Sequence, residues 1–222
     1  MKREFQLTQD GSHTLFVPEL NEHYHSTHGA VREAIHVYIN AGLRQCANDD
    51  IHLLEIGFGT GLNAFLTLLE SEKIDKRIVY TSLELYPISL EEAEKLNYAA
   101  HIFPDRAADF LQLHEVEWGR CVEMNNRFSL LKLNGDVTNQ EVLTSLGTFD
   151  VIYFDAFAPE KQPKMWSKEV FESLLSICNP DAVLTTYCAK GVIRRLLQEV
   201  GFVVERLQGP PGKREMLRGR RV

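Results

Sequence analysis

Short apolar runs alternate with longer amphipathic segments along most of the chain. The apolar runs have the length of buried strands, and the segments between them carry apolar residues at helical spacing. This alternation predicts an α/β domain with a mostly parallel sheet and helices on both of its faces. Seven strands are expected, at residues 51–56, 77–85, 128–133, 149–154, 182–187, 202–206 and 215–220, with the last two at an edge of the sheet.

Helices are expected between these strands, at residues 61–71, 89–98, 139–146, 167–178 and 190–200. Ser89 and Glu92 have the spacing of a capping box, which marks the start of the second helix. Two regions depart from the alternation. Residues 1–47 are expected to form an N-terminal extension packed on the core, with a hairpin at Asp10-Gly11 and a helix over 29–43. Residues 99–127 are expected to form a helical insertion in the main domain at 48–222, either shaping a substrate site or serving as structural padding.

Composition adds the broad class of protein. A chain of 222 residues with 44% hydrophobic and 25% charged residues is expected to form one globular domain without a membrane span. The first residues lack the features of a secretory signal, which predicts a cytoplasmic protein. The four cysteines are scattered without a CxxC pair, which favours reduced thiols over disulfides or zinc, so no metal is expected.

Charge is distributed unevenly. The net charge is −7, but residues 190–222 carry nine Lys or Arg against three Glu. Such a basic end could follow a phosphate backbone, or it could be a solvated face that keeps the protein soluble.

A glycine-rich segment, EIGFGTGLN, joins the first predicted strand to its helix. Its glycines allow a tight turn and the close approach of a ligand to the backbone. The GxGxG spacing differs from the GxGxxG of dinucleotide sites, and this favours a nucleoside ligand without a pyrophosphate, such as S-adenosylmethionine. The carboxylate of Glu55 suits the charged amine of that ligand, unless it is only a turn residue. The expected ligand contacts here are Glu55, Gly57, Phe58, Gly59, Thr60, Gly61 and Asn63.

Two further acids follow the next two strands. Glu84 stands where doubly wound folds place an acid that binds ribose hydroxyls, and Leu85 is expected beside it. Asp136 lies at the same carboxyl edge, where it could accept a hydrogen bond from an adenine amino group. The alternative for both acids is a helix cap or a turn.

The fourth core strand ends in the motif FDAFAPEKQPKMW. Asp155 is expected to hydrogen-bond an amine, orient its lone pair and receive its proton, although it could instead be a cofactor ligand. A carboxylate also raises the pKa of a bound ammonium ion, so desolvation must oppose it. Phe157 and Trp166 could provide an apolar wall or stack on a base, or simply pack.

Two weaker patterns remain. The turn GPPGKREM brings Lys213 and Arg214 together, which suits phosphate contacts, or else it is an exposed edge hairpin. His23, Tyr24, His25 and His28 favour a polar lid over a metal site, because no cysteine or cluster of carboxylates accompanies them.

Together, GFGTGLN, Glu84, DAFAPEKQPKMW and PPGKREM resemble the methyltransferase half of the MnmC family of tRNA 5-methylaminomethyl-2-thiouridine biosynthesis proteins, over residues 20–222. The resemblance implies a class I Rossmann-like methyltransferase that methylates the primary amine of 5-aminomethyluridine at the wobble position of bacterial tRNA. It implies that Asp155 contacts the amine and that the glycine loop, Glu84 and Asp136 hold S-adenosylmethionine. Pro159, Lys164, Lys213 and Arg214 are expected on the tRNA side.

Fused members of that family also carry a flavin-dependent oxidase domain, and this sequence ends just after KREM. It therefore resembles a stand-alone form, for which neither FAD nor an oxidase domain is expected. Two alternatives stay open: a small-molecule amine methyl- or aminopropyltransferase, and a non-catalytic nucleotide-binding module. The GxGxG spacing disfavours NAD.

Overall fold

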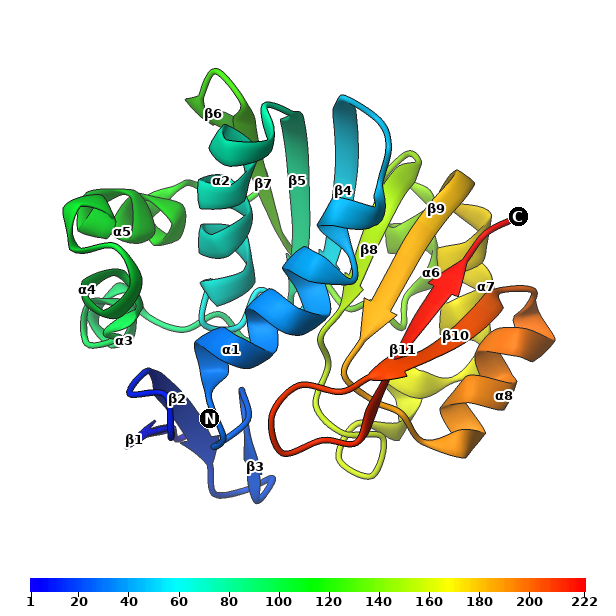
Figure 1. Ribbon diagram of the computed structural model, residues 1–222, viewed down its shortest axis with the longest axis horizontal. Helices are drawn as coiled ribbons and strands as arrows, with labels where there is room; N and C mark the ends of the chain where they lie inside the picture. Colours follow the sequence, from blue (N-terminus) through cyan, green and yellow to red (C-terminus); the bar gives the residue numbers. More distant parts are fainter.

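The computed structural model describes residues 1–222 and is built around an eight-stranded mixed sheet (Figure 1). The strand order is β10-β11-β9-β8-β4-β5-β7-β6. The five strands β9, β8, β4, β5 and β7 are parallel to one another. β11 is antiparallel to β9 and β10, and β6 is antiparallel to β7. The strands are β4 (Asp50–Ile56), β5 (Arg77–Glu84), β6 (Cys121–Asn125), β7 (Phe128–Asn134), β8 (Phe149–Phe154), β9 (Cys178–Thr186), β10 (Val203–Gln208) and β11 (Glu215–Arg220).

The predicted fold class is confirmed, with two corrections. The strand count of seven was one too low, because the insertion ends in β6 and is not wholly helical. The sequence of β6, CVEMN, lacks an apolar run because none of its residues is fully buried. The prediction that both final strands are edge strands was also wrong. Of these two strands only β10 is at an edge, because β11 lies between β9 and β10. Met216 and Leu217 of β11 are fully buried, as an internal strand requires.

Helices cover both faces of the sheet, as predicted. One face packs against α1 (Ala30–Ala34), the π-helix Ile35–Asn40 that continues it, a short 3-10 helix (Leu43–Gln45), α2 (Leu62–Ile74) and α5 (Ala107–Glu115). The other packs against α6 (Gln140–Thr144), α7 (Lys168–Ser176) and α8 (Gly191–Val200). Residues of β8 alternate between the two cores, with Val151 and Tyr153 in one and Ile152 and Phe154 in the other. This is why the strand reads as one continuous apolar run.

The helix predicted over 89–98 is divided into α3 (Leu90–Glu94) and α4 (Tyr98–Ile102). The capping box of Ser89 and Glu92 is present. The interruption is explained by Asn97, whose side chain accepts from the His13 N–H at 2.7 Å and donates to the Gly11 carbonyl at 2.8 Å. Contacts with the N-terminal segment thus override the local helical pattern. A 3-10 turn (Pro104–Arg106) follows α4, and another (Pro163–Trp166) precedes α7.

The first 23 residues form a separate small antiparallel sheet of β1 (Glu4–Leu7), β2 (His13–Val17) and β3 (Glu22–His23). The β1–β2 hairpin turns at Asp10-Gly11, as predicted. In Figure 1 this sheet lies below the central sheet, near the ends at which the parallel strands finish. It is therefore placed to cover the loops that follow those strands.

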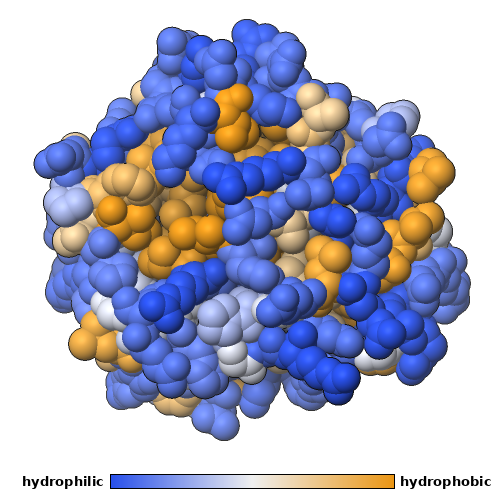
Figure 2. Space-filling view, viewed as in Figure 1, coloured by the Kyte–Doolittle hydropathy of each residue, from blue (hydrophilic) through white to orange (hydrophobic).

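The molecular surface is mixed in character. On the face shown in Figure 2 most residues are hydrophilic, and hydrophobic residues gather in a hollow left of the centre. No helix has the length and apolar composition required to span a membrane.

Candidate active site

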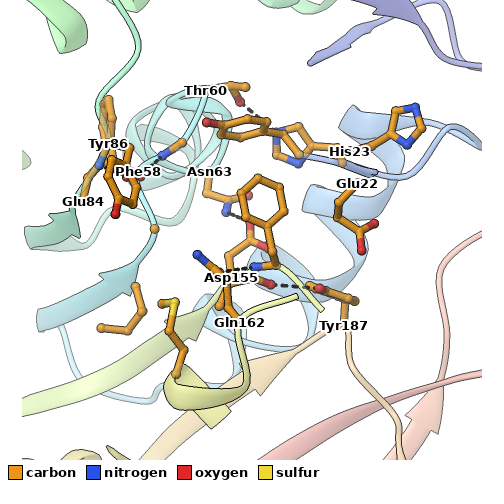
Figure 3. A pocket seen from close by; sticks show the side chains of 18 of the residues that line it. Glu22, His23, Phe58, Thr60, Asn63, Glu84, Tyr86, Asp155, Gln162 and Tyr187 are labelled. Carbon is orange, nitrogen blue, oxygen red and sulfur yellow. Dashed lines mark hydrogen bonds between the residues drawn. The ribbon is translucent and has the colours of Figure 1, made fainter. Parts of the chain in front are cut away.

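A cavity of about 290 Å³ lies at the carboxyl edge of the parallel strands. Its walls come from the loops that follow β4, β5, β7 and β8, and its roof comes from residues 22–27 of the N-terminal region (Figure 3). Ligands of open α/β sheets bind in this position, because the strand ends leave a crevice between diverging loops. The cavity brings together these predicted residues: Gly57, Phe58, Gly59, Thr60, Asn63, Glu84, Leu85, Asp136, Asp155, Phe157 and Lys213.

The glycine loop after β4 is fixed by its backbone. The Gly57 N–H donates to the Leu83 carbonyl at 2.8 Å. Gly57 has φ +94°, and a Cβ there would lie 2.7 Å from the Asp155 carbonyl oxygen. Any side chain would therefore meet the loop after β8 and face a strained backbone as well. The two loops approach each other closely only because this residue is glycine.

Glu84 holds the glycine loop from the neighbouring strand. Its carboxylate accepts the Gly59 N–H at 2.9 Å and the Tyr86 N–H at 2.7 Å. Asp136 accepts the Thr138 N–H and hydroxyl, both at 2.8 Å and both through Oδ1. Both acids thus make the turn contacts that the alternative reading expected, and both also line the cavity. Because each carboxylate retains free lone pairs, these contacts leave room for a bound nucleoside.

Asp155 follows β8 directly and is held by the Asn63 side-chain amide, which donates to Oδ2 at 2.8 Å. Desolvation raises the pKa of Asp155 to about 7, and the nearby charge of Glu33 acts in the same direction. The Tyr38 hydroxyl, the Asn63 amide and the charge of Lys213 oppose this rise. A carboxyl group with such a pKa can both take up and release a proton near neutral pH.

The roof of the cavity is formed by the histidine-rich segment. His25 Nε2 lies 2.7 Å from the Thr60 hydroxyl of the glycine loop, and burial lowers the pKa of His25 to about 4, so the ring is neutral. The Tyr24 ring meets Phe157 edge-on, with ring centroids 5.0 Å apart. These contacts agree with the predicted polar lid. His23 and His28 instead pair with the side chains of Gln6 and Gln9.

An arginine fastens this roof to the wall of the cavity. Arg3 donates to the Tyr24 hydroxyl at 2.9 Å and to the Tyr86 carbonyl at 2.6 Å, and it pairs with Glu92 at 3.0 Å. The side chain of Arg3 is 7% exposed. The N-terminal sheet is thus connected to the loop after β5 and to the start of α3.

The loop after β8 is stiffened by contacts with its own backbone. The Phe157 N–H donates to the Gln162 side chain at 3.0 Å, and the Tyr187 hydroxyl donates to the Ala156 carbonyl at 2.8 Å. Trp166, expected on the substrate side, is buried against Phe154 and does not line the cavity. Its Nε1 donates to the Phe157 carbonyl at 2.8 Å. It therefore supports the loop from behind, as the packing alternative anticipated.

Some predicted residues lie away from the cavity. Glu55 and Gly61 do not line it. Lys164 is exposed and lines neither this cavity nor the groove that adjoins it. Glu55 is fully buried, accepts the Ser82 hydroxyl at 2.7 Å, and has its pKa raised chiefly by desolvation. Glu55 therefore lies behind the loop and away from the cavity, so its contact with a ligand amine stays a prediction.

A second, more open groove of about 530 Å³ adjoins the cavity. Tyr187 and Lys213 line both spaces, and Pro159 and Arg214 line the groove alone. Its other cations are Lys190, which pairs with Glu160, and Arg206, which lies 3.5 Å from Glu215. The predicted cations of the terminal turn, Lys213 and Arg214, therefore both line the groove, and Lys213 lines the cavity as well.

Several lining residues escaped the sequence analysis. Glu33, Tyr86, Gln162 and Tyr187 all line the cavity, and so does Tyr24 of the segment predicted as a lid. Glu33 lies in a predicted helix outside the motifs, and only the packing of α1 against the cavity reveals it.

Comparison with known proteins gives a consistent picture. Residues 106–222 match the family described as S-adenosyl-L-methionine-dependent methyltransferase. The chain is also 33% identical, over 93% of its length, to the tRNA 5-methylaminomethyl-2-thiouridine biosynthesis bifunctional protein MnmC of Burkholderia multivorans, and 36% identical over 74% to that of Pseudomonas fluorescens. It spans 33% and 26% of those proteins.

Solved structures share the fold. MNMC2 from Aquifex aeolicus superimposes with a TM-score of 0.81 at 23% identity, over 98% of this chain and 70% of that one. Spermidine synthase from Thermotoga maritima gives a TM-score of 0.54 at 12% identity, over 100% of this chain and 79% of the other. The cavity lies at the ligand edge of this fold, and the family match covers more than half of the sequence. The chain therefore belongs to the S-adenosyl-L-methionine-dependent methyltransferase family.

Proposed function

We propose that the protein transfers a methyl group from S-adenosylmethionine to the primary amine of 5-aminomethyl-(2-thio)uridine at the wobble position of tRNA. The observation that carries the proposal is Asp155, which lines the cavity beside the glycine loop and has a pKa of about 7. Similarity to the tRNA 5-methylaminomethyl-2-thiouridine biosynthesis proteins MnmC supports a tRNA substrate. Since the chain spans only about a third of those proteins, their full activity is not carried over.

The residues that line the cavity suit S-adenosylmethionine as a ligand. Gly57 lets the glycine loop lie directly against the loop after β8, and both loops line the cavity in which the nucleoside would lie. Glu84, Leu85 and Asp136 line the cavity, where Glu84 would bind the ribose hydroxyls, Asp136 would accept from the adenine amino group and Leu85 would contact the base. When bound, S-adenosylmethionine supplies a methyl group on a sulfonium ion that a neutral amine can attack.

The protein's own contribution is chiefly positioning. Asp155 would hydrogen-bond the amine and take its proton, while Asn63 keeps the carboxyl in place. Tyr24 and Phe157 form an apolar wall that excludes water from the reacting atoms. Holding two reactants in line at short distance accounts for a large part of the rate of such displacements. The adjoining groove, with Arg206 and Arg214, would contact the phosphates flanking the modified nucleotide.

Methyl transfer from radiolabelled S-adenosylmethionine tests the proposal. The acceptors are tRNA that carries the 5-aminomethyl group and the same tRNA without it. We expect label in the wobble nucleoside of the first tRNA only, and Asp155→Ala should abolish it. Binding of S-adenosylmethionine to that variant, measured by calorimetry, separates the two roles left open for Asp155. Unchanged affinity assigns it to the amine, and lost affinity assigns it to the cofactor. A wild-type protein that leaves the aminomethyl tRNA unlabelled would refute the substrate assignment.

A small polyamine is the second candidate, because Glu22, Glu33 and Asp155 give the cavity an acidic lining. Unmodified tRNA discriminates between the two. It should inhibit a tRNA enzyme, and more strongly at low salt, whereas an enzyme that acts on small amines should be unaffected.

A further inference from the structure

Glu33 and Lys213 form an ion pair inside the cavity, on the side that faces the second groove. Lys213 Nζ donates to Glu33 Oε1 at 2.7 Å and lies 3.8 Å from the centroid of the Tyr187 ring. Glu33 Oε2 accepts the Ser26 N–H at 2.7 Å. The side chain of Glu33 is 7% exposed and that of Lys213 is 32% exposed. The ammonium group is thus fixed between a carboxylate and an aromatic face.

This arrangement differs from that of a phosphate-binding lysine. A lysine that binds a phosphate backbone is normally solvated and mobile, whereas Lys213 already has a carboxylate partner and a cation–π contact. Glu33 of α1 joins the neighbouring roof to the turn before β11, which lies 180 residues away in the sequence. A contact between them at this point places one positive charge at the inner end of the groove.

The charges around Lys213 decide what it can do. The titratable groups that face it come from α1 (Glu33), the roof (Glu22 and His25), the loop after β8 (Asp155), the end of β9 (Tyr187 and Cys188) and the groove (Lys190, Arg206, Arg214 and Glu215). His25 is neutral, and burial keeps Tyr187 and Cys188 protonated. Lys213 is the only Lys or Arg side chain that lines the cavity, alongside five carboxyl groups, namely Glu22, Glu33, Glu84, Asp136 and Asp155.

An amine acceptor meets a difficulty in such a cavity. A primary alkylamine is protonated at neutral pH, as a lysine side chain is, and an ammonium ion has no lone pair with which to attack a methyl group. Neighbouring carboxylates favour the ammonium form, while a neighbouring cation opposes it. Glu33 cannot act as a free carboxylate while Lys213 neutralises it.

We propose that Lys213, fixed by Glu33 above Tyr187, is a positioning residue that keeps the bound acceptor amine unprotonated. The inference rests on the proposed amine acceptor. The amine arrives as an ammonium ion and gives one proton to the Asp155 carboxylate. Its lone pair then forms the new N–C bond, the C–S bond breaks, and its electron pair remains on sulfur. The methylated product leaves as a secondary ammonium ion, and Asp155 loses its proton to solvent.

The pH dependence of methyl transfer tests the role of Lys213. Single-turnover rates are measured from pH 5.5 to 9.5 with saturating S-adenosylmethionine and aminomethyl tRNA, so that the rate reports the bound complex. Lys213→Met should move the acidic limb to higher pH by about one pH unit or more, a roughly tenfold loss of rate at pH 7. Glu33→Gln removes a negative charge and should move the limb to lower pH. Lys213→Arg keeps the cation and should restore the wild-type limb.

Lys190→Met is the matched control, since Lys190 pairs with Glu160 in the groove but does not line the cavity. Its acidic limb should coincide with that of the wild type. A Lys213→Met limb that also coincides, with a uniformly lower rate or a weaker affinity for tRNA, would overturn the inference and make Lys213 a structural or RNA-binding residue. An inactive wild-type protein would instead refute the proposed function, and this inference with it.

Discussion

Replacing Asp155 by Asn should make the unliganded protein more stable at pH 8, although the same change removes the proton acceptor that we propose. The native structure raises the pKa of Asp155 from 3.8 to about 7, mainly by desolvation. Between these values the folded protein holds a proton that the unfolded chain has lost. Ionisation of Asp155 therefore opposes folding increasingly as the pH rises through this window, and the penalty is complete above about pH 7. A neutral amide carries no such penalty.

The size of the effect follows from the pKa. A rise of about three pH units, at about 1.4 kcal/mol each, sets an upper limit of about 4 kcal/mol at pH 8. Asp155 is partly open to the cavity, and water there lowers the penalty. We expect Asp155→Asn to gain about 2–4 kcal/mol of unfolding free energy at pH 8 and about 1 kcal/mol at pH 5. Asn63 can still donate to the side-chain oxygen that remains.

Urea denaturation of both proteins at pH 5 and pH 8 measures this difference, with methyl transfer assayed in parallel. Asp150→Asn is the matched control, because Asp150 belongs to β8, the strand that Asp155 follows. The Asp150 carboxylate accepts from the His52 N–H at 2.8 Å and from two asparagine side chains, so its loss should destabilise the protein by about 1–3 kcal/mol. A gain for Asp155→Asn that is absent, or equal at both pH values, would show that desolvation of Asp155 does not oppose folding.

Two further predictions concern the loop and the roof. Gly57→Ala should weaken S-adenosylmethionine binding at least tenfold in calorimetry. Gly119 has a similar φ of +81°, but nothing lies within 4 Å of an added Cβ, so Gly119→Ala should only lower stability, by about 1–3 kcal/mol. Equal effects of the two alanine substitutions on binding would exclude a steric cause. Arg3→Met removes the bond to Tyr24 and should speed cofactor dissociation several-fold in stopped flow. Lys2→Met breaks an exposed ion pair and should not change the dissociation rate. Equal dissociation rates for the two variants would show that the roof does not retain the ligand.

The sequence was informative about the sheet because β4, β8 and β9 are buried on both faces over most of their length. That environment requires continuous apolar runs, and such runs are visible without any tertiary information. β6 was not predicted, because an exposed antiparallel edge strand needs no continuous apolar run. The break between α3 and α4 escaped for a different reason, since it depends on the bonds that Asn97 makes across 84 and 86 residues. Contacts of that range leave no periodic trace in the chain.

The site divides in the same way. Asp155 and Glu84 could be found because they follow strands whose ends must meet at one edge of the sheet. Glu33 belongs to a helix and reaches the cavity only through the packing of α1. Lys213 was noticed as a basic residue, but its carboxylate partner lies 180 residues away, so its charge was assigned to solvent and phosphate. Sequence patterns thus located the ligand edge but not the charge balance within it.

The insertion has a role that the glycine motif alone would not suggest. A Cβ on Gly61 would lie 2.7 Å from His114 Nε2 of α5, so this glycine makes room for the insertion, whereas Gly57 makes room for the loop after β8. The Phe58 ring between them meets His114 with centroids 5.3 Å apart and lies 5.3 Å from Lys132 Nζ. The glycine loop is therefore clamped from both sides. Glycines in such a loop are usually explained by the space that they leave for a ligand. In this protein Gly57 and Gly61 are also required by the neighbouring protein segments that pack against the loop.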